Sequence, residues 1–122
     1  MILPKRRERQ RSGIQRAPAR DFQRHHRWVR SLECVVPDCD CIQLGRPIEC
    51  CHLLLGTDGG TSIKPSSWWT YPGCSHHHAE SHRIGEASFQ AKYKLDLRAI
   101  CLALAKQSPD TAMRDAMREA GL

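Results

Sequence analysis

The sequence predicts a small α+β fold in which a strand-forming half precedes a helical half. Turns and short extended segments occupy residues 34–73, and after Pro72-Gly73 apolar residues recur at helical spacing. The chain has 122 residues, enough for one domain. No apolar run approaches the roughly 18 residues of a membrane span, and the arginine-rich start lacks the apolar core of a signal peptide. We therefore expect a cytoplasmic protein with no membrane partner.

Positive charge is concentrated at the start of the chain. Residues 1–30 carry ten basic and two acidic side chains, net +8, whereas residues 31–122 carry nine and eleven, net −2. Residues 1–20 contain almost no large apolar side chains, which predicts a basic disordered arm. Such an arm either solubilises the protein or binds a polyanion through counterion release. In the second case the nucleic-acid-binding residues include Lys5, Arg6, Arg7, Arg9 and Arg11.

Residues 21–95 should form the main domain, beginning with a short helix over 21–30. Phe22 and Trp28 lie near helical spacing there. Residues 34–48, rich in Cys, Pro and Gly, predict a loop, and the apolar segment 48–55 predicts a strand. A Thr-Asp-Gly-Gly turn over 57–60 follows, and a second extended segment is expected over 67–71.

Helices are expected from residue 75 to the end. The first should run over about 75–84 and end at Gly85, and the second over 86–93. A C-terminal helical extension, residues 96–122, is expected to follow the main domain. Its first helix should cover about 95–107, slightly overlapping that boundary, and its last should begin with Ser108 as N-cap and Pro109 as the first helical residue.

Cysteine and histidine side chains indicate a metal centre. The chain has seven of each and no secretion signal, so metal binding is favoured over disulfide bonds. Cys74 and His77 form a Cys-x2-His knuckle, and Cys34 and Cys39 offer two further thiolates, with Cys41 as a substitute for Cys39. Four such ligands suit a structural Zn²⁺, which a fold of about 90 residues would need for stability.

A second group of histidines indicates a second metal. His78 and His82, four residues apart on a helix, share a face that His77 does not. If all the ligands served a single structural zinc, the other histidines would be ordinary surface or core side chains. Five imidazoles around one ribbon and helix, counting His52 and His76, exceed what that zinc requires.

These residues resemble the HNH, or ββα-metal, endonuclease family. The likeness lies in the order of short motifs: Cys51-His52, the Gly56-to-Gly60 turn, Lys64-Pro-Ser66, Trp69 and Cys74-x2-His-His78-x3-His82. It covers about residues 28–95, is specific over 49–86 and is nearest to the phage and prophage branch. In layout alone, the basic arm before the domain is similar to the RecA-dependent phage nucleases.

The resemblance implies a metal-dependent endonuclease with a small zinc-stabilised ββα-metal core. His52 matches the general base, and His78 and His82 match ligands of a catalytic divalent metal such as Mg²⁺, Mn²⁺, Ni²⁺ or Zn²⁺. Cys51 stands where many members have a further metal ligand, and it either coordinates, is buried, or yields its place to water. The residues Cys34, Cys39, Cys74 and His77 match the structural zinc site that many members add.

The resemblance also implies the substrate. It is double-stranded or branched DNA, with a recombination or phage DNA-processing protein as a further partner; Lys64 either touches a phosphate or is a solvated surface lysine. The chain has no Asn, so the motif Asn that orients the base histidine must be replaced by Ser67, Trp69 or a backbone carbonyl. A non-catalytic zinc-stabilised nucleic-acid-binding module is the alternative.

Overall fold

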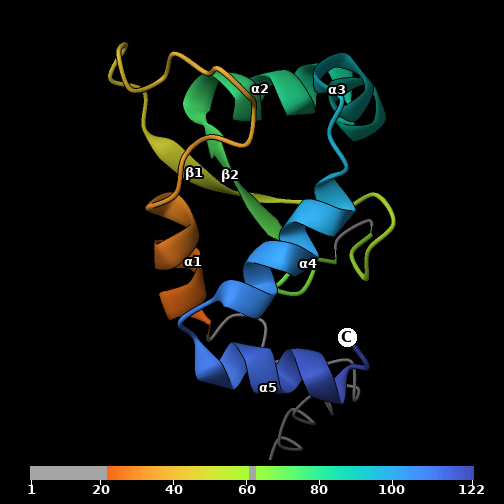
Figure 1. Ribbon diagram of the computed structural model, residues 1–122. Helices are drawn as coiled ribbons and strands as arrows, with labels where there is room; N and C mark the ends of the chain where they lie inside the picture. The colour runs from red at the N-terminus through yellow and green to blue at the C-terminus, as the bar shows by residue number, and fades with distance from the viewer. Residues whose placement is uncertain (1–21, 61–62) are drawn as a thin grey trace, which may run out of the picture.

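The structure is a computed structural model that describes residues 22–60 and 63–122. Within these ranges the chain forms five helices and one two-stranded sheet, which confirms the predicted α+β class (Figure 1). The predicted arm over residues 1–20, with its proposed nucleic-acid-binding side chains, lies outside the described residues. In chain order the elements are α1 (Gln23–Arg30), β1 (Ile48–His52), β2 (Thr70–Cys74), α2 (Ser75–Ile84), α3 (Glu86–Tyr93), α4 (Leu97–Gln107) and α5 (Thr111–Glu119).

The sheet pairs β1 with β2 in antiparallel register, from Ile48 opposite Cys74 to His52 opposite Thr70. The second strand was predicted too early, because residues 67–69 form a turn closed by Trp69 N–H donating to the Ser66 carbonyl. β2 then continues through Pro72-Gly73, the pair expected to end it. Proline is tolerated here because each strand of a two-stranded sheet is an edge strand.

Helix boundaries in the second half follow the local capping residues. α2 and α3 have the predicted bounds, separated by Gly85 at φ 88°. α4 begins at Leu97 because the Asp96 carboxylate accepts from Ala99 N–H. The predicted Ser108 cap is wrong: Asp110 caps α5, and Ser108 follows the end of α4.

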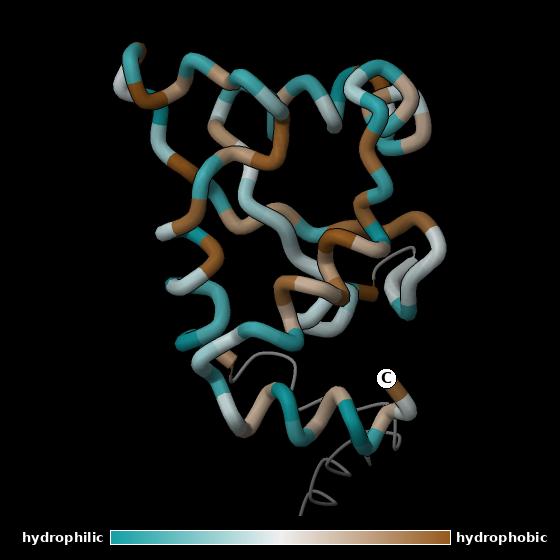
Figure 2. The backbone as a smooth tube through the Cα atoms, in the orientation of Figure 1, coloured by the Kyte–Doolittle hydropathy of each residue, from teal (hydrophilic) through white to brown (hydrophobic). Residues whose placement is uncertain are grey.

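The core lies between the sheet and the C-terminal helices. Figure 1 shows α2 and α3 at one end of the strands, α1 and α4 flanking them, and α5 beyond. Hydrophobic residues are frequent in α4 and in the segment after β1, whereas α1 and α5 are mostly hydrophilic (Figure 2). The largest fully buried side chains are Tyr71, Phe89, Leu53, Leu97 and Met113. None of the helices found in the described ranges is long and apolar enough to cross a membrane.

Candidate metal sites

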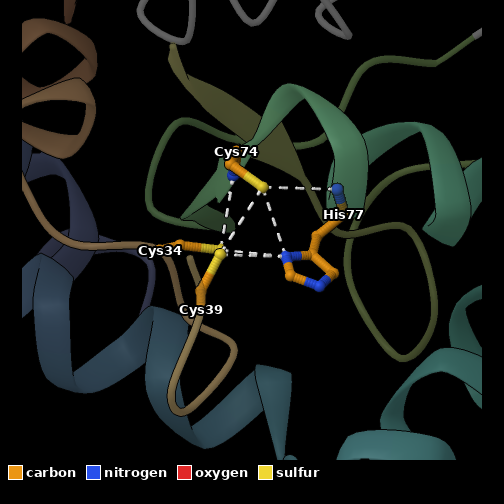
Figure 3. Close-up of side chains that lie close together, drawn as sticks. All are labelled: Cys34, Cys39, Cys74 and His77. Atoms are coloured by element: carbon orange, nitrogen blue, oxygen red, sulfur yellow. Dashed lines mark hydrogen bonds between the residues drawn. The ribbon is translucent and has the colours of Figure 1, made fainter. Parts of the chain in front are cut away.

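Cys34, Cys39, Cys74 and His77 form one cluster that can hold a metal ion (Figure 3). Their ligand atoms all lie within 4.8 Å of one another. The His77 Nδ1 atom lies 3.5, 3.4 and 3.2 Å from the three sulfurs, in chain order, and Cys39 Sγ lies 3.8 Å from Cys74 Sγ. In a tetrahedral zinc site, S···S and S···N separations are about 3.8 and 3.6 Å. The cluster therefore fits a structural zinc.

The junction between β2 and α2 positions this cluster. Cys74 is the last residue of the strand and the N-cap of the helix, where its Sγ accepts from His77 N–H at 3.5 Å. Its own N–H donates to Cys34 Sγ at 3.4 Å. Burial raises the pKa of the Cys39 thiol to about 12. A bound cation would reverse this shift, because metals bind the thiolate.

The structure brings Cys39, not Cys41, into the cluster. The Cys41 side chain is buried at 3% exposure, and it is absent from the one group of three or more potential ligands found among the described residues. The open choice between the two thiols is thereby answered in favour of Cys39.

His78 and His82 form a separate pair on the exposed side of α2. Their Nε2 atoms are 3.1 Å apart, and His78 Nδ1 lies 3.1 Å from Glu49 Oε1 on β1. Two imidazole nitrogens bound at about 2.1 Å to a shared ion lie roughly 3.0–3.4 Å apart. Glu49 favours the tautomer with its proton on Nδ1, which leaves Nε2 of His78 free to bind metal.

Gly73 lets β1, β2 and α2 approach one another at this pair. Glu49 stands opposite Gly73 in the sheet. A Cβ on Gly73 would lie 2.8 Å from Cys51 Sγ and 4.0 Å from the Cβ of His78. Cys51 is fully buried, with its Sγ 4.0 Å from the Gly73 carbonyl oxygen. Of the three alternatives for Cys51, the structure fits that of a buried core thiol.

His52 ends β1 and packs toward α1. Its ring lies 5.7 Å from the ring of His26 at an interplanar angle of 78°, and its Nε2 is buried without a hydrogen-bond partner among the described atoms. Burial, followed by the charges of Lys64, His26 and His78, lowers the pKa of His52 to about 4. His52 is thus a neutral imidazole within electrostatic range of His78.

Two further residues of the motifs, Lys64 and Trp69, lie on the surface and in the core respectively. Lys64 is exposed and close enough to His52 to affect its pKa. Trp68 and Trp69 are both buried, at 8% and 4% exposure, so they belong to the core, and Arg98 lies over the Trp69 ring.

Two residues near these sites were missed in the sequence. Glu49 had a signal, since a carboxylate is unusual in a short strand and lies three residues before His52. His26 had none beyond the pair of histidines in α1, because its contact with β1 joins segments far apart in the chain.

Comparison of the chain with models of known protein families, with curated proteins and with solved structures finds no match. The side-chain geometry above is therefore the basis for assigning a function.

Proposed function

We propose that the protein is a metal-dependent endonuclease of the HNH type that hydrolyses DNA phosphodiester bonds. The pair His78 and His82 carries this proposal. The Nε2 atoms of the two histidines lie 3.1 Å apart, and His78 is hydrogen-bonded to a carboxylate. Neither histidine belongs to the four-ligand cluster, so the pair is available for a second metal. Two protein ligands leave coordination positions open for phosphate and water, which a structural site does not provide.

In this proposal His52 is the general base. Phosphodiester hydrolysis needs a deprotonated water, and a neutral imidazole can accept that proton. The lowered pKa keeps His52 neutral throughout the physiological pH range. A divalent cation at His78 and His82 would neutralise charge on the phosphate and stabilise the leaving oxygen.

Glu49 orients the first of these ligands. Its carboxylate accepts from Nδ1 of His78, so the imidazole is held with Nε2 toward His82. Such carboxylate–histidine pairs increase ligand basicity and fix the ring.

The substrate assignment depends on charge. Lys64 and Arg30 both depress the pKa of His26, and Lys64 also depresses that of His52, so positive charge acts on these two rings. Together with the net +8 of residues 1–30, they favour a polyanionic substrate bound through its phosphates.

One observation favours the non-catalytic alternative, a zinc-stabilised nucleic-acid-binding module. Nε2 of His52 is buried, so water reaches His52 through its other ring nitrogen or after a local movement. A module of this kind would bind DNA and zinc without cleaving DNA.

Nicking of supercoiled plasmid with Mg²⁺, Mn²⁺, Ni²⁺ or Zn²⁺ distinguishes the two functions. The endonuclease should nick the plasmid, and His52→Ala should slow nicking by about 10² to 10⁴-fold while keeping both metals. His78→Ala should abolish activity together with the second metal. The control His76→Ala removes an exposed imidazole from the same helix and should leave the rate unchanged. DNA binding with no nicking by any of the four metals would support the non-catalytic module.

A further inference from the structure

His26 and its neighbour His25 differ in the hydrogen bonding of their ring nitrogens. His25 is fully buried, and its two ring nitrogens lie 2.7 Å from Ser108 Oγ and 3.1 Å from Thr70 Oγ1. His26 is 6% exposed, yet its Nε2 is buried with no partner among the described atoms. Burying a polar nitrogen without a hydrogen bond is unfavourable. Hydrogen bonding therefore explains a histidine at position 25 and not at position 26.

The ring of His26 contacts the ring of His52 instead. The two centroids are 5.7 Å apart and the planes are inclined by 78°, an edge-to-face arrangement that is favourable between aromatic rings. Burial, followed by Lys64 and Arg30, lowers the pKa of His26. Both rings are therefore uncharged near neutral pH, as close packing of two imidazoles requires.

Two polar groups near His52 have partners of their own. Thr70, opposite His52, has its hydroxyl between the His25 ring and the Ser67 carbonyl. The Trp69 carbonyl accepts from Leu53 N–H at 2.9 Å.

We propose that His26 is a positioning residue for His52, fixing the orientation of that imidazole through edge-to-face packing from α1. The inference rests on the proposed function, in which His52 is the base and the orienting Asn of related nucleases is missing. It assigns that work to a residue outside the ββα motif.

Two substitutions distinguish the contribution of the His26 ring from that of its nitrogen atoms. His26→Phe keeps a flat ring and removes both nitrogens, whereas His26→Ala removes the ring. In plasmid nicking, His26→Ala should lower kcat at least tenfold with KM and zinc content unchanged. His26→Phe should retain kcat to within about threefold. A purely structural role would instead change the melting temperature and leave kcat per folded, zinc-loaded molecule the same.

Nuclear magnetic resonance of the His52 ring provides a readout that does not need activity. In the wild type and in His26→Phe, the His52 ring signals should be sharp, with cross-relaxation to residue 26; in His26→Ala they should broaden or move. If the wild type does not nick DNA but these spectra behave as expected, the endonuclease proposal fails and the positioning proposal stands. Unchanged His52 signals in folded His26→Ala, or a loss of kcat in His26→Phe as large as in His26→Ala, would overturn the positioning role.

Discussion

Helix α2 carries two histidine environments on adjacent residues, and their donor sets differ. His77 joins three cysteines in a cluster whose four ligand atoms lie within 4.8 Å. His78, rotated by about 100° on the helix, meets one further imidazole and the Glu49 carboxylate. Four protein donors fill a tetrahedral ion and stabilise a fold, whereas two leave positions open for a substrate. A rotation of about 100° between neighbouring residues thus separates a cluster that can hold a structural metal from the site proposed for chemistry.

Removing a ligand from the four-donor cluster should have the largest effect. Cys74→Ser removes one thiolate from the cluster, while the serine hydroxyl can still accept at the N-cap of α2. We expect loss of zinc and unfolding at room temperature, because structural zinc supplies about 10 kcal/mol of binding free energy in small zinc domains. Zinc content and circular dichroism measure this. Cys41→Ser, which removes a buried thiol outside the cluster, should keep the zinc; retention of zinc and melting temperature by Cys74→Ser would contradict the assignment.

Weakening the two-histidine site should leave the fold intact. Glu49→Gln removes the carboxylate that orients His78. We expect affinity for the second metal to fall about 10- to 100-fold, with the melting temperature of the zinc-loaded protein nearly unchanged. Isothermal titration with Mn²⁺ or Ni²⁺ measures the affinity. Glu33→Gln, an exposed carboxylate elsewhere, is the control, and equal affinities for the two variants would remove Glu49 from the site.

Substitution of Gly73 tests whether the close approach of β1, β2 and α2 at this residue is needed for stability. A methyl group there would lie 2.8 Å from Cys51 Sγ in the core, so Gly73→Ala should lower the free energy of unfolding by about 1–3 kcal/mol. Gly60→Ala meets nothing within 4 Å and should change it little. Chemical denaturation gives both values. Adding Cys51→Ala should restore part of the loss, and an undiminished effect in that double variant would show that the clash is not the cause.

The smallest expected effect is a pH dependence of stability that originates at His25. Burial lowers the pKa of His25 to about 4 in the folded protein, against about 6.5 unfolded. Between pH 4 and pH 6.5, His25 is therefore protonated in the unfolded chain and neutral in the folded protein. The stabilisation is complete above pH 6.5 and falls toward pH 4, by at most about 1.4 kcal/mol per pH unit.

Urea denaturation of zinc-loaded protein from pH 7.5 to 5.5 measures this slope. His25→Gln, which removes the titrating ring, should give a flatter dependence over the same interval. Equal slopes at equal zinc content would assign the pH dependence to other groups.

The sequence predicted the features that depend on local spacing. Gly85 marks the boundary of α2 and α3, and the Cys-x2-His spacing of Cys74 and His77 identifies half of the Cys/His cluster that can hold a metal. Capping was predicted less well, because both Ser108 and Asp110 suit an N-cap and a distant residue decides between them. Ser108 is the C-cap of α4 and its Oγ contacts His25, whereas Asp110 accepts from Met113 N–H at the start of α5.

Contacts that join distant segments could not be predicted in this way. The register of β1 and β2 places Glu49 opposite Gly73, and only this pairing brings its carboxylate to His78. Likewise, the packing of α1 on the sheet brings His26 to His52. Neither contact has a signature in the spacing of residues along the chain.

The His25 contacts also bear on the order in which the protein folds. They join residues 45 and 83 positions apart, and His25 N–H additionally donates to Asp110, 85 positions away. The four residues of the cluster that can hold a metal are all synthesised before Ser108, and their loops are shorter than those to Ser108 and Asp110. Because closing longer loops is slower and entropically more costly, we expect the Cys/His cluster to form before His25 reaches Ser108 and Asp110. On a ribosome, a nascent chain ending before Ser108 would already carry all four residues of the Cys/His cluster, while His25 would still lack its partners Ser108 and Asp110.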